Sequence, residues 1–309
     1  MLCSLKHPKP MPVPILLPVL TLANGWNRTR VGCIPVTSVI QQGPGLVGSL
    51  KPVFGAIFSV LLCSVPIWAA TDAPDPAERQ RILEKVRQSA TRYLDNLPNF
   101  VCARVTEQFE AGKKPDHWKR LETLTERIIF NQAKENLSLE LVNGKPLKPG
   151  RYIKRPLETS GEFGDLVRTV IDEKTEARIS WSRWEDLNGH RLAVFEYLVD
   201  AEHTKISVSL DSLEVIVPYR GFLYADPKTG DLWRITSSPF NMPVALQTKS
   251  VVTTIDYGPV DIGNKRYLLP VSANILMDTG KNNLLNKISF TQYRKFDTES
   301  KITFVSGSN

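Results

Sequence analysis

The stretch from Val215 to Ser237 restricts the fold most strongly, because it has the pattern of a β-hairpin. Its two apolar segments flank the connection Asp226-Pro227-Lys228-Thr229-Gly230. An aspartate that starts a turn, a proline with fixed φ and a glycine that can adopt positive φ suit a four- or five-residue loop on a type I turn. We expect the first strand to run from Val215 to Ala225, with apolar residues on both of its faces.

Most of the chain after residue 100 has the same alternating pattern. Asn143-Gly144 and Asn188-Gly189 are standard pairs for tight hairpin turns. Besides the hairpin above, we expect strands at residues 100–109, 118–130, 137–142, 178–185, 191–199, 206–210, 248–257, 265–277 and 285–296, with residues 302–305 at a sheet edge. The sequence therefore predicts one antiparallel meander of about ten or eleven strands.

Two segments have helical periodicity instead. Residues 77–95 carry an apolar stripe that includes Ile82 and Val86, and the helix is expected to stop before Pro98. In the second segment, residues 159–172, Thr159 and Glu162 have the spacing of a capping box. The apolar residues of this second helix recur at i, i+3, i+4, i+7 and i+8, and they are Phe163, Leu166, Val167, Val170 and Ile171. We therefore predict an α+β domain over residues 71–309, with two amphipathic helices packed on the sheet.

Residues 47–70 have the layout of a secretory signal peptide. Lys51 precedes an apolar run from Val53 to Leu62, followed by Pro66 and the small residues Ala69 and Ala70. Residues 1–46 are rich in Pro, Gly and Thr, and we expect them to be unstructured and to precede the true translation start. The alternative is an uncleaved anchor, although the run is shorter than the ~20 residues of a membrane span. We expect an exported protein, periplasmic or envelope-associated, with no integral membrane span in its mature form.

The charge of the chain is concentrated in this leader. Its first 70 residues hold five basic side chains and no acidic one, which leaves 34 Lys and Arg against 32 Asp and Glu in the remainder. A nearly neutral body lacks the basic footprint of a nucleic-acid-binding protein. Cys102 is the only cysteine after residue 70. We expect a small buried residue in a strand there, and a reactive or intermolecular thiol is the alternative.

Side chains arranged for catalysis or metal binding are not found in the sequence. His117, His190 and His203 lie in or beside predicted loops, and none has a second His or Cys at a metal-ligand spacing. Asp226 begins a segment similar to a phosphorylated-aspartate motif, but the inserted Pro227 breaks that motif. We therefore predict no catalytic residue, no metal and no cofactor, and regard an enzyme as the third choice.

The order of elements resembles the lipoprotein-carrier superfamily of unclosed half-barrels, the LolA, LolB and RseB type. The residues that carry the resemblance are the hairpin G-x-L-x-x-D-P-x-T-G-x-x-x-R-I from Gly221 to Ile235, followed by Leu269-Pro270 and by Tyr293. The likeness covers about residues 77–305 at the level of layout. It implies a strongly curved, unclosed sheet with an apolar concave face, against which the helices lie as a lid. The alternative is a sheet folded over itself into a sandwich or closed barrel.

The resemblance implies a non-enzymatic module that binds a lipid, an acyl chain or a lipidated protein between the sheet and the second helix. The expected lining residues are Phe163, Leu166, Val170, Trp181, Phe195, Tyr197, Phe222 and Trp233. Hydrophobic transfer would drive such binding, at about 0.8 kcal/mol per buried methylene. The alternative is an interaction module with a fully packed interior, which docks on an envelope protein through its sheet edge or loops.

Overall fold

The computed structural model describes residues 73–114, 117–148, 153, 157, 161–204, 206–210 and 213–296. The predicted leader and the predicted edge strand at 302–305 lie outside these residues. The helices are α1 (Pro76–Asn96) and α2 (Asp165–Ile171). The strands are β1 (Phe100–Ala111), β2 (Lys119–Asn131), β3 (Lys134–Val142), β4 (Lys145–Pro146), β5 (Arg178–Leu187), β6 (His190–Val199), β7 (Ser207–Leu210), β8 (Leu213–Ile216), β9 (Tyr219–Ala225), β10 (Leu232–Pro239), β11 (Ser250–Ile262), β12 (Lys265–Asp278) and β13 (Asn283–Lys295).

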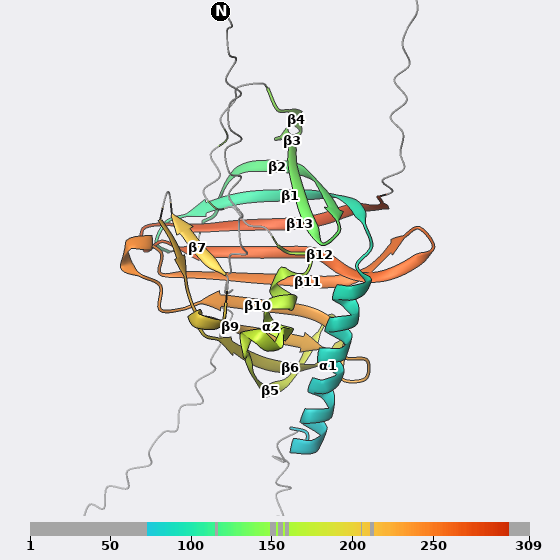
Figure 1. Cartoon of the computed structure of the whole chain (residues 1–309). Helices are drawn as coiled ribbons and strands as arrows, with labels where there is room; N and C mark the ends of the chain where they lie inside the picture. Colours follow the sequence, from blue (N-terminus) through green and yellow to red (C-terminus); the bar gives the residue numbers. More distant parts are fainter. Residues whose placement is uncertain are drawn as a thin grey trace, which may run out of the picture. The chain divides into compact units, whose positions relative to one another are not determined.

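Eleven of these strands form one sheet, in the order β4-β3-β2-β1-β13-β12-β11-β10-β9-β6-β5 (Figure 1). The pairings within it are antiparallel, and β7 and β8 form a separate two-stranded sheet. Because β1 pairs with β13, the first and last strands lie side by side in the middle of the sheet. The outermost strands β4 and β5 do not pair with each other, so the sheet is not closed. The predicted α+β class and the unclosed sheet of ten or eleven strands are confirmed.

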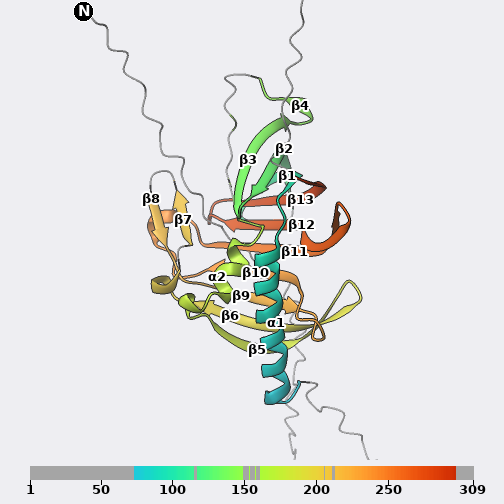
Figure 2. The same cartoon turned by 45° about the vertical axis from the view of Figure 1, so that its right-hand side comes forward.

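The curvature of the sheet has a local cause in the strands. The register shifts within six of the strand pairs, for example between Val101 and Ala103 of β1 and between Trp181 and Arg183 of β5. An extra residue in one strand of a pair bends that strand and increases its twist. The sheet accordingly curves around the side on which α1 and α2 lie (Figure 2).

Helix α1 follows its sequence signals closely. The Asp75 side chain accepts a hydrogen bond from Glu78 N at 2.8 Å and caps the helix, and Pro76 occupies its first turn. The predicted apolar stripe is buried, with Ile82 and Val86 fully inaccessible. None of the helices in the described ranges combines the length and the apolar character that a membrane span requires.

The β9–β10 hairpin has the predicted turn, and the turn packs directly on α1. The Asp226 side chain accepts hydrogen bonds from the backbone N–H groups of Lys228 and Thr229. Gly230 has φ +80°, and a Cβ atom there would lie 2.3 Å from the carbonyl oxygen of Lys85. Glycine is therefore required at this position for two reasons, the positive φ of the backbone and the close contact with the helix.

The strand before this turn is shorter than predicted. It is divided at Val217-Pro218 into β8, which pairs with β7, and β9, which joins the main sheet. Proline has no N–H to donate to a sheet ladder, and Pro218 lies where the pairing with β7 ends and the pairing with β6 and β10 begins. Val217 is nevertheless buried, so the apolar pattern continues across the break.

The prediction of the second helix was wrong at its N-terminus. Thr159 lies outside the described residues, and α2 begins only at Asp165, with Gly164 as an N-cap that makes no side-chain hydrogen bond. Gly161 and Gly164 have φ +88° and +149°, which are not helical values. The Glu162 carboxylate, assigned to the capping box, instead contacts the guanidinium of Arg104 on β1. A buried tertiary ion pair therefore replaces the local cap.

Candidate functional site

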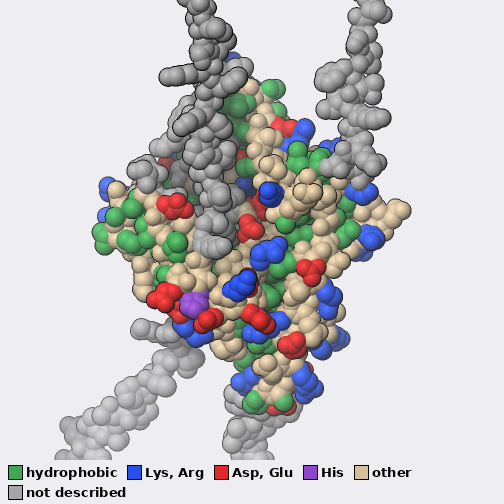
Figure 3. All heavy atoms as spheres, viewed as in Figure 1, with side chains coloured by type: hydrophobic (Ala, Val, Ile, Leu, Met, Phe, Trp, Pro, Cys, Tyr) green, Lys and Arg blue, Asp and Glu red, His purple; other side chains and the backbone are tan. Residues whose placement is uncertain are grey.

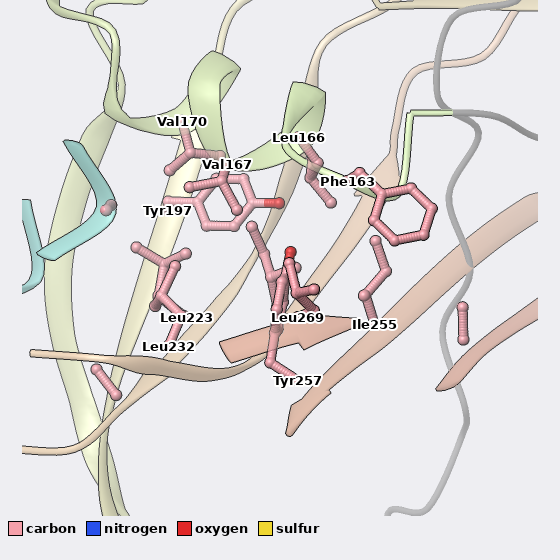
Figure 4. Packing of buried hydrophobic residues seen from close by; sticks show 14 of the residues in the cluster. Phe163, Leu166, Val167, Val170, Tyr197, Leu223, Leu232, Ile255, Tyr257 and Leu269 are labelled. Atoms are coloured by element: carbon pink, nitrogen blue, oxygen red, sulfur yellow. The ribbon is translucent and has the colours of Figure 1, made fainter. Parts of the chain in front are cut away.

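The concave face of the sheet and the two helices enclose the main hydrophobic core. From the sheet, the core includes Tyr197, Leu223 and Ile255, and α2 contributes Leu166 and Val170. Figure 4 shows the apolar side chains of α2 and of the preceding Phe163 facing those of the strands. On the outer surface over the helices, acidic and basic side chains are interspersed (Figure 3). An apolar interior thus lies beneath a polar helical cover.

Six of the eight predicted lining residues are brought together in this interior. Phe163, Leu166, Val170, Phe195 and Tyr197 are at most 1 % exposed. Trp181 is half-buried and packs against the same core, with its ring centroid 5.5 Å from that of Phe195. The prediction that these residues bind a ligand remains a prediction, but their common location in one core is established.

Phe222 and Trp233 lie elsewhere, in a second cluster built on Leu192, Val194 and Tyr224. Successive residues of a strand point to opposite faces, and the neighbours Leu223 and Leu232 both belong to the main core. Phe222 and Trp233 therefore face away from the helices.

This second cluster is covered by polar side chains of the same sheet. The Arg183 guanidinium lies 5.1 Å from the Phe222 ring centroid, and the His190 ring stacks on Trp233 at 4.1 Å. Apolar residues occur on both faces of β9, so the sequence pattern alone did not identify the inner face.

The interior contains little empty space. A cavity of about 40 Å³ lies between α1, α2 and the sheet, lined by Ser89, Ala90, Tyr93, Val167, Asp231, Leu232, Tyr257 and Leu268. It could hold a few water molecules, but not an acyl chain. An open groove of about 340 Å³ lies beside it, lined by Ser89, Arg92, Tyr93, Asn96, Leu97, Asp231, Arg266, Tyr267, Leu268 and Leu269. In this conformation the predicted cleft is filled by side chains.

A buried group of charges lies near the start of α2, and sequence reasoning missed it. The Arg104 guanidinium on β1 is 3.1 Å from a carboxylate oxygen of Glu162 and 3.8 Å from one of Glu126 on β2. All three side chains are at most 4 % exposed. Arg104 follows the inward residues Phe100 and Cys102 of β1, and Glu126 lies between the inward residues Leu124 and Ile128 of β2, and a charge that continues an apolar alternation is the signal that could have revealed the group.

Glu135 on β3 ties this charge group to the loop that leads into α2. Its carboxylate accepts hydrogen bonds from the backbone N–H of Gly161 at 3.2 Å and of Phe163 at 3.1 Å. The residue is half-buried as a whole, but its carboxylate faces these groups inside the protein. Burial, and then repulsion from Glu162, raises the pKa of Glu135 to about 8. Glu135 is therefore largely protonated at neutral pH.

The remaining polar groups of the interior offer little for catalysis. Cys102 is buried as predicted, and burial raises the pKa of its thiol to about 12, so it is almost entirely in the thiol form at neutral pH. In the described part of the chain, no three His, Cys, Asp or Glu side chains are grouped so that they could hold a metal ion.

No protein-family model matches the chain, and no curated protein matches it. Among solved structures it is similar to a LolA superfamily protein from Nitrosomonas europaea, at 10% identity and a TM-score of 0.37 over 71% of this chain and 94% of that one. A DUF1329 family protein from Desulfovibrio piger has 8% identity and a TM-score of 0.36 over 71% and 94%. The Mycobacterium tuberculosis lipoprotein LppX has 10% identity and a TM-score of 0.23 over 71% and 96%.

These matches include a protein of the superfamily that the sequence resembles. TM-scores below 0.5 carry no information on function.

Proposed function

We propose that this chain is a non-enzymatic binding module of the bacterial envelope. It takes up a lipid, an acyl chain or the acyl group of a lipidated protein between the concave face of the sheet and the helices α1 and α2. The observation that carries this proposal is that an extensive apolar interior is covered, on one side, by a helix of only seven residues.

Helix α2 has little stability of its own. Isolated helices shorter than about 12–15 residues are marginal in water, and its N-cap Gly164 supplies no side-chain hydrogen bond. It is held by Leu166, Val167 and Val170, which are each 1 % exposed. An acyl chain offers the sheet the same kind of apolar surface, so it can replace the contacts of α2 and release the helix.

Because the cavity is too small for a chain, binding requires α2 to move outward. The ligand then lies against Phe163, Leu166, Val170, Trp181, Phe195 and Tyr197, the six predicted residues that share the interior. Phe222 and Trp233 belong to the other face and take no part in this site.

The test is titration of the mature protein with a fluorescent fatty acid, together with native mass spectrometry of protein purified from the periplasm. We expect saturable binding, and mass peaks that correspond to bound lipid. Protein that is reproducibly empty and fails to bind the fluorescent probe would contradict the proposal.

A matched pair of variants tests the movement of α2. Val170→Ala removes two methyl groups from the contact between α2 and the sheet, and Val194→Ala removes the same groups from the opposite face. If release of α2 limits binding, Val170→Ala raises the association rate several-fold, since about 1 kcal/mol is a factor of about five. Equal rates for both variants would show that α2 is not the lid.

The packed interior favours a second candidate, an interaction module that docks on an envelope protein. The small volume of the cavity is the observation that supports it. Under this alternative no probe binds in the interior, and affinity capture from envelope extracts yields a partner that binds saturably. Saturable fatty-acid binding without any such partner would exclude it.

A further inference from the structure

The groove beside α1 and the cavity behind it form one polar-to-apolar passage. The last turns of α1 supply one wall of the groove, and residues Arg266 to Leu269 of β12 supply the other. Groove and cavity share the lining residues Ser89, Tyr93, Asp231 and Leu268, so the two spaces adjoin. The cavity in turn reaches Val167 of α2. A ligand that enters here meets the core directly beneath the lid.

The inner end of this passage holds a hydroxyl without a partner. Tyr257 on β11 is 4 % exposed and lines the cavity, and its Oη makes no hydrogen bond within the described residues. Buried hydroxyl groups are nearly always hydrogen-bonded, because removal from water without compensation is unfavourable. The neighbouring Tyr93 ring packs at 89° to the Tyr257 ring with centroids 5.9 Å apart, and the Tyr93 hydroxyl donates its own hydrogen bond to the carbonyl oxygen of Phe163. None of the described residues therefore satisfies the Tyr257 hydroxyl, and a ligand could supply the missing hydrogen-bond partner.

The outer end of the passage is charged. Arg92 is exposed on α1 and lines the groove. Arg266 is engaged with Asp261 at 2.8 and 3.0 Å, and Asp231 accepts a hydrogen bond from the Ser89 hydroxyl. Arg92 is thus the cation of the groove that is best placed to meet an anionic group from solvent.

We propose that this passage is the head-group subsite of the acyl ligand. The carboxylate of the ligand lies where the groove meets the cavity, with the Tyr257 hydroxyl donating a hydrogen bond to one of its oxygens and Arg92 facing it from the groove, and the chain runs inward beneath α2. This inference rests on the proposed function and adds to it the orientation of the ligand and its class, an acyl chain that ends in a carboxylate.

The first test compares two probes on the intact mature protein, a fluorescent fatty acid and an uncharged naphthylamine dye without a carbonyl. Tyr257→Phe is expected to weaken fatty-acid binding about three- to tenfold, the worth of one hydrogen bond, and to leave dye binding unchanged. Tyr219→Phe is the control, since that buried hydroxyl lies at the far end of β9 from the turn at the groove. Thermal denaturation of Tyr257→Phe should show no loss of stability, because the substitution removes no hydrogen bond of the empty protein.

The second test replaces Arg92 with alanine and compares the fatty acid with its methyl ester. We expect Arg92→Ala to weaken binding of the acid and to leave the ester unaffected. The outcomes separate the two proposals. If the wild-type protein binds neither probe, the proposed function fails. If it binds both, and Tyr257→Phe and Arg92→Ala bind the acid as the wild type does, the head-group subsite is wrong, water satisfies Tyr257, and the apolar interior remains the binding site.

Discussion

Substitution of Glu135 by glutamine should change how the stability of the protein depends on pH. Glu135 has an ordinary pKa of 4.5 and a pKa of about 8 in the folded protein, raised mainly by burial. The folded state therefore keeps a proton that the unfolded chain loses between these two values. The stabilisation by this proton is complete below pH 4.5 and declines as the pH rises toward 8. Above pH 8 it is lost, and the stability no longer changes with the titration of Glu135.

The size of the effect follows from the shift. Each pKa unit corresponds to about 1.4 kcal/mol, so the free energy of unfolding should fall by at most about 5 kcal/mol over this range. Glutamine resembles the protonated acid in shape and charge, but its NH2 group cannot accept one of the two hydrogen bonds that the backbone N–H groups of Gly161 and Phe163 donate. At pH 5 Glu135→Gln should therefore be less stable than the wild type by about 1–3 kcal/mol, whereas at pH 9, where the wild type has lost up to about 5 kcal/mol, the variant should be the more stable of the two.

Urea unfolding of both proteins at pH values from 5 to 9 measures this difference. Glu140→Gln serves as the control, because Glu140 lies on the same strand and its carboxylate pairs at the surface with Arg127. We expect the wild type and Glu140→Gln to lose stability in parallel as the pH rises, and Glu135→Gln to lose less. If all three curves run parallel, the carboxylate of Glu135 does not titrate in this range, and the raised pKa assigned to Glu135 is wrong.

Three further predictions follow from the fold and the leader. Gly230→Ala should destabilise the protein by more than about 2 kcal/mol, since its Cβ would meet the Lys85 carbonyl, whereas Gly263→Ala, with φ +60° and open space around it, should cost about 1 kcal/mol in thermal unfolding. Cys102 should react with a thiol reagent only on the time scale of unfolding, and rapid labelling of the native protein would contradict its burial. Protein from the envelope of the native host should begin between Ala70 and Pro74 by intact mass, and a mass that includes residues 1–50 would refute export with cleavage.

The strands and α1 could be predicted because their signals are local. Alternation, turn pairs such as Asn188-Gly189 and the proline after α1 each act within a few residues. The start of α2 could not be predicted in this way. Glu162 fits a local capping box, but Arg104, 58 residues earlier in the chain, holds its carboxylate. A pattern confined to four residues contains no information about that contact.

The candidate site could be predicted only in part, because the sequence pattern is again local. Hydrophobicity identified the residues to be buried, and six of the eight meet in one core. It did not show on which side of the sheet the helices lie, so Phe222 was grouped with residues of the other face. Glu135 escaped notice because a glutamate near a strand end resembles a solvent-exposed residue until the backbone N–H groups of Gly161 and Phe163 are placed against it.

The pairing of β1 with β13 also determines when, during synthesis, the main sheet can form. Phe100 has Lys295 as its partner, so the centre of the sheet stays open until nearly the whole chain has been synthesised. Contacts so distant in sequence form slowly. If residues 47–70 act as the predicted export signal, this delay would keep the precursor extended while it crosses the membrane. Nascent chains that end before Asn283 should accordingly be digested by protease, and resistance should arise only once β13 has emerged.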